Sequence, residues 1–303
     1  MPMLDVYKSF YNFKEQPFRL SPDCSFCYSH PSYANAKSYL QYAVLEGEGF
    51  VAITGEPGTG KTTLIGSLLA ELDKTRVQVA TLTNVQIDSA NLLNMVLEEF
   101  ELPMGNQSQT NPLSTLKKFL IEQYKNDRRC ILIVDEAQGL SITSLEELRL
   151  ISNLQYNNRL LLQVFLVGQQ PLMDIIRAPG LEQLHQRIIA ASHLESLGLE
   201  ETMAYVIHRL RKAGWNNDPV LPDETMRLVY KFSGGVPRRI NLICHRLFLY
   251  GGLKQKHELI GADALHVIVE LYKENLLMPE IGKELSNYVG NVKPHPVKID
   301  AAR

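Results

Sequence analysis

The chain has 303 residues, of which 45% are hydrophobic and 21% are charged, and its formal net charge is −2. These values predict a compact fold with one large and one smaller domain, and they argue against a general nucleic-acid coat protein. Four scattered cysteines do not fit a secreted disulfide scaffold. The N-terminus has no signal-peptide pattern, and no apolar stretch approaches the roughly 20 residues that cross a bilayer. We therefore expect a cytoplasmic protein without direct membrane insertion, which reaches a membrane only through partners.

Residues 5–30 combine aromatic and turn-forming residues without a regular period. We expect this aromatic segment to be irregular and to pack on the larger domain. Pro31 then begins a helix that is predicted to end at about Leu45, because proline fits the first turn of a helix.

Beyond this helix, short apolar runs alternate with helical patterns. Strands are predicted at Phe50–Thr54, Val77–Leu82, Cys130–Val134, Leu160–Val167 and Ile188–His193. Helices are predicted between them, at residues 61–73, 88–100, 112–126, 143–154 and 170–186. Buried strands that alternate with helices are typical of an α/β fold, in which helices cover both faces of a parallel sheet.

From Glu200 onward the strand pattern stops, and helices are predicted at residues 200–213, 222–233, 237–251 and 261–277. We therefore predict an α/β domain over residues 1–195, with the aromatic segment 1–30 packed on it. A small all-helical lid domain should follow over residues 196–278. Residues 279–303, which contain Pro294 and Pro296 and show weak periodicity, are expected to form a flexible tail.

A glycine-rich motif follows the first predicted strand and leads into a helix: Gly55-Glu56-Pro57-Gly58-Thr59-Gly60-Lys61-Thr62-Thr63. It matches the P-loop pattern G-x4-G-K-[ST] in the structural context that this motif requires. Glycines let backbone N–H groups surround phosphate oxygens, and the helix presents its positive N-terminus to them. Lys61 is expected to bind the β- and γ-phosphates of ATP, and the Thr62 hydroxyl to ligate Mg2+. The alternative is a glycine-rich turn that arose by chance, which the strand–helix context disfavours.

Two acidic residues, Asp135 and Glu136, end the third predicted strand. The carboxyl end of a buried parallel strand is where ligands bind in such sheets. We expect Asp135 to hold Mg2+ through water and Glu136 to orient and polarise the attacking water. The second acid favours water as the nucleophile over the acceptor of a small-molecule kinase. Gln138 is near enough to contact the same site, although a solvated position fits it equally well.

The fourth predicted strand ends in Gly168-Gln169-Gln170. A polar side chain at this point would lie between the acids and the γ-phosphate, and Gln169 is the preferred candidate. Gln170 is the second candidate, and a polar pair that only begins a helix is the alternative to both.

Two arginines of the lid, Arg238 and Arg239, follow Pro237 in the first turn of a predicted helix. Cations there oppose the helix dipole, by roughly 0.3–1 kcal/mol each, unless an anion lies nearby. ATP would supply that anion, so Arg238 is the candidate for a phosphate contact from the lid. An ordinary surface charge is the alternative. Arg187, before the fifth predicted strand, is by itself only a cation at a helix end.

Two other sequence features are weaker indications of a functional site. Cys24 and Cys27 form a single C-x2-C pair, whereas a zinc site needs four ligands. Arg209, Arg211 and Lys212 would form a basic strip on a lid helix, which is typical of a solvated helix face and less often of a contact with DNA or a partner.

With these residues in place, the chain resembles the AAA+ ATPases of the general secretion pathway protein A (ExeA-like) family, which includes ATPases of MSHA-type pilus biogenesis and of exosortase-linked loci. The resemblance covers roughly residues 5–275. It lies in the N-terminal Phe10…Pro17-Phe18…Ser21-Pro22-Asp23 pattern, the P-loop, Asp135-Glu136-Ala137-Gln138, Leu166-Val167-Gly168-Gln169, Gln186-Arg187-Ile188 and Gly235-Val236-Pro237-Arg238-Arg239-Ile240-Asn241.

This resemblance implies a strand order of 5-1-4-3-2 and assembly into an ATP-dependent ring or filament with nucleotide between subunits. It implies that Arg187 is an arginine finger that reaches the γ-phosphate of a neighbouring subunit. It also suggests that the aromatic segment packs beside the adenine through Phe18 or Tyr28. ExeA-like proteins often continue into a membrane span and a peptidoglycan-binding domain, and for this chain we expect no direct cell-wall role.

The motifs predict a Mg-dependent ATPase, and the resemblance implies that it is oligomeric and assembles or remodels an envelope system for secretion, pilus formation or exopolysaccharide export. One alternative is a DNA-linked ATPase, since helpers of transposition and recombination look similar over the same core. Another is a nucleotide-dependent interaction switch that binds ATP without needing to hydrolyse it.

Overall fold

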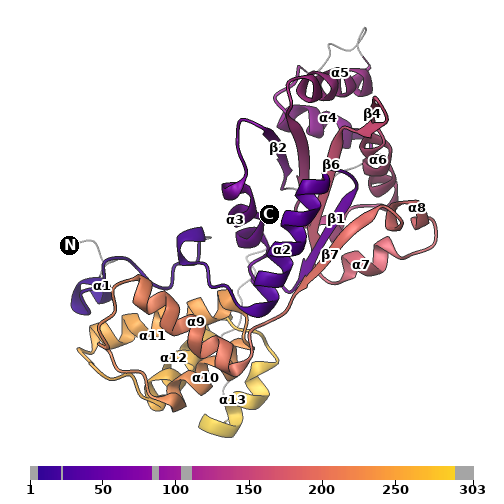
Figure 1. The fold of residues 1–303 in the computed structure, drawn as a ribbon. Helices are drawn as coiled ribbons and strands as arrows, with labels where there is room; N and C mark the ends of the chain where they lie inside the picture. Colours follow the sequence, from indigo (N-terminus) through magenta and orange to yellow (C-terminus); the bar gives the residue numbers. More distant parts are fainter. Residues whose placement is uncertain (1–5, 22, 84–88, 104–110, 291–303) are drawn as a thin grey trace, which may run out of the picture. The chain divides into compact units, whose positions relative to one another are not determined.

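A computed structural model describes residues 6–21, 23–83, 89–103 and 111–290. The chain divides into two compact units, which are treated separately below. The α/β unit comprises Ser29–Glu195, and the helical unit comprises Met1–Tyr28 together with Ser196–Arg303 (Figure 1).

The α/β unit is built on one parallel sheet of five strands: β1 (Phe50–Gly55), β2 (Val77–Leu82), β3 (Arg129–Val134), β6 (Leu162–Gly168) and β7 (Ile188–Leu194). Their order is β2-β3-β6-β1-β7. Counted along the chain within this sheet and read from the β7 edge, this is the expected order 5-1-4-3-2. A short antiparallel ribbon, β4 (Gln155–Tyr156) with β5 (Arg159–Leu160), was not predicted and precedes β6.

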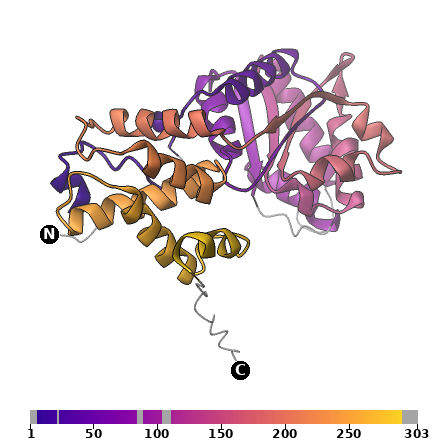
Figure 2. The ribbon, with the colours of Figure 1, turned by 90° about the horizontal axis from the view of Figure 1, so that it is seen from below.

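Helices cover both faces of this sheet. Alternate strand residues on one face form a buried cluster with α4 (Ser89–Glu99), α5 (Pro112–Lys125), α6 (Ile142–Ser152), α7 (Pro171–Ile176) and α8 (Glu182–His185). On the other face, α2 (Pro31–Glu46) packs on β7, and α3 (Lys61–Glu71) packs on β1 (Figure 2). The single helix predicted at 170–186 is two helices, because Pro179 and Gly180, with φ of +100°, interrupt it.

The helical unit contains α9 (Leu199–Lys212), α10 (Asp223–Ser233), α11 (Pro237–Leu253), α12 (Gly261–Lys273) and α13 (Ile281–Val289). Glycine and proline mark their ends: Gly234, in the left-handed conformation, ends α10, and Pro237 begins α11. Part of the expected tail is therefore ordered, since α13 lies within it and Leu285 is completely buried in the core of this unit. Residues 291–303 of that expected tail lie outside the described residues.

The aromatic N-terminal segment also differs from the prediction. It forms α1 (Val6–Phe10) and the 3-10 turn η2 (Cys24–Phe26), and it packs in the core of the helical unit instead of on the α/β domain. Its buried rings in that core are Tyr7, Tyr11, Phe13, Phe18 and Phe26. The physical reason lies in α11, where Gly251 and Gly252 leave room for Tyr11 and Tyr7 to approach the helix backbone.

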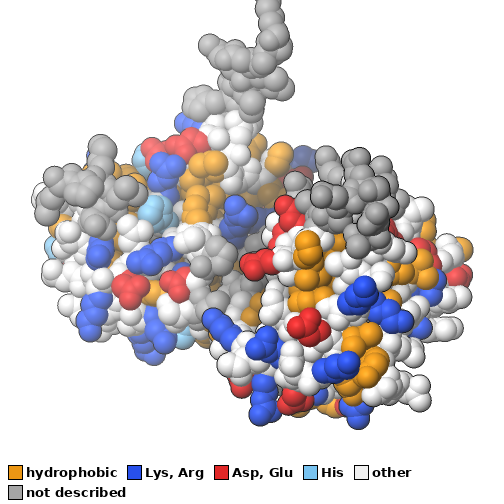
Figure 3. Space-filling model, turned by 90° about the horizontal axis from the view of Figure 1, so that it is seen from above, with side chains coloured by type: hydrophobic (Ala, Val, Ile, Leu, Met, Phe, Trp, Pro, Cys, Tyr) orange, Lys and Arg blue, Asp and Glu red, His pale blue; other side chains and the backbone are white. Residues whose placement is uncertain are grey.

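Side chains of both charge signs are interspersed on the face shown in Figure 3, in keeping with the small net charge. Within the described ranges, no helix is long and apolar enough to cross a membrane. The same ranges contain no group of three or more His, Cys, Asp or Glu side chains arranged to hold a metal ion.

Candidate functional site

The motif after β1 forms a tight turn at the carboxyl edge of the sheet. A Cβ atom on Gly55 would lie 2.6 Å from the carbonyl oxygen of Leu194, so only glycine fits there. Gly58 and Gly60 have φ of 89° and 102°, which glycine adopts readily. Gly60 is the N-cap of α3, and the turn therefore leads directly into the positive end of that helix.

Lys61, the first residue of α3, is only 7% exposed. Its ammonium group donates to the carbonyl oxygens of Gly55 at 2.9 Å and Glu56 at 3.0 Å. Burial lowers the pKa of Lys61, and the nearby carboxylates of Glu136 and Asp135 partly offset that shift. The cation and both predicted acids are therefore close enough to act on one another.

The other residues of the motif differ in exposure. Thr59 is buried, and its hydroxyl donates to the carbonyl oxygen of Glu56 at 2.9 Å. This hydrogen bond stabilises the turn. Glu56, Pro57 and Thr62 are exposed, and Thr63 is half-buried. The Thr62 hydroxyl is thus open to a ligand beside the first turn of α3.

The acidic pair follows β3 at the same edge of the sheet. The backbone N–H of Glu136 donates to a carboxylate oxygen of Asp135 at 2.9 Å. Glu136 has φ of +52°, a left-handed conformation that is uncommon for a residue with a side chain. Such backbone conformations are found preferentially at functional sites.

Gln138 and Gln169 join this acidic pair. Gln138 donates to a carboxylate oxygen of Glu136 at 2.6 Å and accepts from the backbone N–H of Gln169 at 2.9 Å. The side-chain amide of Gln169 lies 3.4 Å from the same oxygen of Glu136. Because β6 lies between β1 and β3, Gln169 occupies the edge between the glycine-rich turn and the acids. Gln170 is exposed at the N-terminus of α7.

Gln138 is the residue that sequence reasoning left open. A Cβ atom on Gly168 would lie 2.6 Å from its amide oxygen, so the glycine before Gln169 makes room for this contact. The signal was present in the sequence as a polar residue two positions after Glu136, but its direction depends on the 3-10 turn η3 (Ala137–Gly139).

Arg187 is not brought near the glycine-rich motif of its own unit. Its carbonyl oxygen accepts from the backbone N–H of Phe50 at 2.9 Å, which places Arg187 at the amino edge of the sheet. The motif lies at the carboxyl edge, beyond β1, a strand that spans roughly 17–20 Å. Within one subunit these two features therefore lie at opposite ends of the same strand.

Arg238 lies in the helical unit, as the second residue of α11, and its side chain is exposed. The turn before it is tightly fixed. Gly235 has φ of +70°, its carbonyl oxygen accepts from the N–H of Leu197 at 2.9 Å, and a Cβ atom there would overlap the carbonyl of Leu197.

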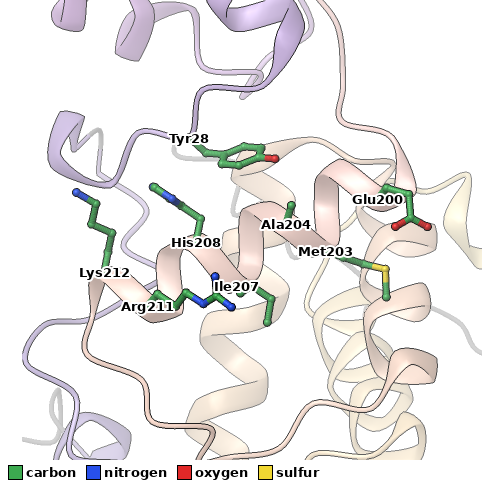
Figure 4. A pocket seen from close by; sticks show the side chains of 8 residues that line it. All are labelled: Tyr28, Glu200, Met203, Ala204, Ile207, His208, Arg211 and Lys212. Atoms are coloured by element: carbon green, nitrogen blue, oxygen red, sulfur yellow. The ribbon is translucent and has the colours of Figure 1, made fainter.

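The helical unit also contains a groove of about 660 Å3 along α9. Figure 4 shows Tyr28 beside α9, with Glu200 and Lys212 at opposite ends of the groove. Arg211 and Lys212 are exposed as expected. Arg209 is 6% exposed, so it was wrongly included in the basic strip.

Phe18 and Tyr28, the two aromatic residues expected to pack beside the adenine, both lie in the helical unit but differ in exposure. Phe18 is completely buried in the core of the helical unit, so its ring is not accessible to a nucleotide in this structure. Tyr28 is half-buried, with its ring 6.0 Å from that of Tyr205 and 5.5 Å from that of His208.

Comparison with known proteins agrees with this geometry. The family model described as an AAA domain matches residues 44–176. General secretion pathway protein A of Aeromonas hydrophila is 36% identical over 259 residues, which cover 85% of this chain and 47% of that protein. The chain therefore spans about half the length of this relative.

Solved structures share the fold at low sequence identity. The Aeropyrum pernix ORC2 protein in its ADPNP–ADP complexes has a TM-score of 0.60 at 15% identity, covering 90% of this chain and 86% of that one. The Aeropyrum pernix ORC1 protein in complex with DNA has a TM-score of 0.64 at 11% identity, covering 86% and 71%. With its P-loop motif and its sheet order, the chain has the α/β P-loop fold of AAA+ proteins, and over most of its length it is similar to general secretion pathway protein A.

Proposed function

We propose that this protein binds and hydrolyses MgATP and uses the reaction to assemble or remodel a system of the bacterial envelope. The observation that carries the proposal is the single edge at which the buried Lys61, the acids Asp135 and Glu136, and the amide of Gln169 converge. A cationic turn beside two acids and a polar side chain is the arrangement that phosphate-anhydride hydrolysis requires.

In this proposal, the backbone of Gly55–Thr63 surrounds the phosphates and Lys61 neutralises the β- and γ-phosphates. To do so, the Lys61 ammonium exchanges its two carbonyl partners for phosphate oxygens. Glu136 holds the attacking water and takes its proton, and Gln169 orients the γ-phosphate. Gln138 fixes the carboxylate of Glu136 by donating a hydrogen bond to one of its oxygens.

The residues present fit Mg2+. This ion prefers oxygen ligands, usually one or two from the protein with waters and substrate phosphates completing the octahedron. The exposed Thr62 hydroxyl and the Asp135 carboxylate supply such oxygens, Asp135 through water. When bound, the ion would neutralise negative charge on the phosphates.

The assembly is proposed to be a homo-oligomer, either a ring or a filament. Arg187 lies at the opposite end of β1 from the phosphate-binding turn, so a finger role for it needs the active site of a neighbouring copy. Arg238 of the lid is proposed to contact the phosphates from the helical unit.

The process is proposed from the relative named general secretion pathway protein A, which supports a partner in secretion. Pilus and exopolysaccharide-export partners are proposed from the resemblance to the ExeA-like family. We place the protein in the cytoplasm, where ATP is available, with any association with the inner membrane made through those partners.

The central test measures ATP turnover of the wild type, Lys61→Ala and Glu136→Gln, with magnesium or with excess EDTA. Lys61→Ala should lose nucleotide binding, whereas Glu136→Gln should bind ATP and retain it, because only the water-activating group is missing. Turnover that persists in Glu136→Gln, or without magnesium, would reject the proposed chemistry.

The shared-site arrangement has its own test. Arg187→Ala should bind nucleotide normally and turn over poorly, and light scattering with an ATP analogue should show oligomers. Mixing Arg187→Ala with Glu136→Gln should give more activity than either variant alone. In the mixed oligomer the intact site of one copy receives the arginine of the other. If the mixture stays inactive, Arg187 does not act across the interface.

A DNA-linked ATPase is the second candidate, favoured by the exposed Arg211 and Lys212 at the groove along α9. Duplex DNA should then stimulate turnover, and the stimulation should fall steeply as salt rises. A third candidate, a nucleotide-dependent interaction switch, would instead keep its biological output in Glu136→Gln.

A further inference from the structure

Arg209 of α9 is a buried cation whose hydrogen bonds go to neutral oxygens. Its Nε donates to the carbonyl oxygen of Pro17 at 2.6 Å, and its Nη1 donates to the hydroxyl of Tyr205 at 2.7 Å. Its guanidinium carbon lies 5.2 Å from the ring centre of Phe26, within cation–π range. Burying a guanidinium is unfavourable unless such partners satisfy it, so the position of Arg209 depends on Pro17, Tyr205 and Phe26.

Tyr205 links Arg209 to α11 by hydrogen bonds. Its hydroxyl donates to the amide oxygen of Asn241 at 2.9 Å, and the Asn241 amide nitrogen donates to the carbonyl oxygen of Arg19 at 3.3 Å. Burial raises the pKa of Tyr205, so the hydroxyl keeps the proton that it donates. The network thus ties α9 and α11 to the N-terminal strap, defined as residues 17–19.

The start of α11 is held from two sides. Before the helix, the N–H of Leu197 donates to the carbonyl oxygen of Gly235 at 2.9 Å. Within the helix, Asn241 lies three residues after Arg238 and is a neighbour of it on the helix surface. The exposed side chain of Arg238 therefore projects from a short backbone segment that is held at Gly235, before the helix, and at Asn241, within the helix.

We propose that Arg209 and Tyr205 are positioning residues, which hold α11 against the N-terminal strap in the orientation that presents Arg238 to the nucleotide. This inference rests on the proposed phosphate contact of Arg238. Arg209 and Tyr205 touch the strap and Asn241, and they act on turnover through α11. The N-terminal aromatic segment thereby becomes part of the nucleotide-sensing machinery of the lid.

The test compares Tyr205→Phe with Tyr11→Phe. Both changes remove one buried tyrosine hydroxyl from the same core, and that of Tyr11 donates to the carbonyl oxygen of Lys256 at 2.8 Å, outside the network. Tyr205→Phe should lower kcat about tenfold and change the affinity for a fluorescent ATP analogue by less than about threefold. Tyr11→Phe should keep kcat within about twofold of the wild type.

A double-mutant cycle with Arg238→Ala separates positioning from simple stability. In the Arg238→Ala background, adding Tyr205→Phe should lower kcat by less than about twofold, because the group that it positions is already gone. Arg209→Lys, which keeps the charge, should retain more activity than Arg209→Met. If Tyr205→Phe fails to fold by circular dichroism, Arg209→Lys takes its place in the cycle.

Different results would reject the role of Arg238 and the role of the positioning residues Arg209 and Tyr205. If Arg238→Ala keeps full turnover, the proposed role of Arg238 is wrong. If Arg238→Ala lowers turnover but the tyrosine variants behave alike, or the two losses multiply in the double variant, the positioning network is wrong.

Discussion

The two units each place a cation in the first turn of a helix, after a glycine that is closely approached by a backbone carbonyl. In the α/β unit the glycine is Gly55, the carbonyl belongs to Leu194, and the cation is Lys61. That cation is only 7% exposed and donates to two carbonyl oxygens of its own turn.

In the helical unit the glycine is Gly235, the carbonyl belongs to Leu197, and the cation is the exposed Arg238. The backbone is fixed in both turns, but only the first turn also fixes the side chain. The proposed phosphate site of the α/β unit is therefore pre-organised, whereas the proposed contact from Arg238 in the helical unit combines a fixed backbone with an adaptable side chain. Leu194 and Leu197, whose carbonyl groups approach the two glycines, are only three residues apart in the chain. The two turns therefore contact opposite ends of the segment 194–197.

The largest expected effect comes from conservative swaps of the two cations. Lys61→Arg should weaken the binding of a fluorescent ATP analogue more than about 100-fold, because the buried turn cannot accommodate the larger guanidinium. Arg238→Lys should lower kcat less than about tenfold, since an exposed side chain can adjust. Similar losses in both variants would show that the two sites are equally pre-organised.

The turn of the helical unit offers a test of backbone fit. Gly235→Ala should lower the free energy of unfolding by at least about 3 kcal/mol, because its Cβ overlaps the Leu197 carbonyl. Gly234→Ala, where φ is +62° and the nearest atom is 3.5 Å away, should lower it by only about 1 kcal/mol. Trp215, the single tryptophan, lies in this unit and reports its urea unfolding by fluorescence. Equal losses would mean that conformation, and not the close approach, requires Gly235.

The fold and the glycine-rich turn before α3 were predictable because their signals are local. Alternating apolar runs and the spacing of glycines around Lys61 depend only on residues near in sequence. The partner of the aromatic segment was not predictable, because apolar content says that a ring is buried but not against what. Arg209 was misplaced for a related reason: the rule that arginine is exposed holds until distant groups, here Pro17 and Phe26, satisfy it.

A smaller effect concerns the acidic edge of the α/β unit. Gly168→Ala should displace Gln138, release the carboxylate of Glu136 and lower kcat about tenfold at unchanged nucleotide affinity. Gln138→Ala removes the clash, so Gly168→Ala should add less than about twofold to the loss in that background. Independent effects of the two changes would show that Gly168 does not act through Gln138.

The smallest effect uses one buried thiol in the core of each unit. Burial raises the pKa of Cys130, in β3, to about 12, and it also raises the pKa of Cys244, in α11. Both thiols should therefore resist alkylation at pH 8 until their own unit opens, since the thiolate is the reactive form. In a chain with Cys24→Ser and Cys27→Ser, the MgATP analogue should slow the labelling of Cys130 more than that of Cys244. The reason is that bound ligand should stabilise the proposed phosphate site of the α/β unit directly, whereas the helical unit is proposed to supply only the contact from Arg238.

The pH dependence of these thiols follows with a definite sign. Between pH 9, the ordinary pKa of the thiol, and about 12, the folded chain keeps the Cys130 proton that the unfolded chain loses. The folded state then binds more protons, so the free energy of unfolding should fall as pH rises through this window. Cys130→Ala should flatten that fall when unfolding by urea is followed at pH 8 and pH 10. A slope that Cys130→Ala leaves unchanged would assign the alkaline loss to other buried groups, among which Cys244 and Tyr11 also have raised pKa values. Both of those lie in the helical unit, so the same titration shows which of the two cores yields first to alkali.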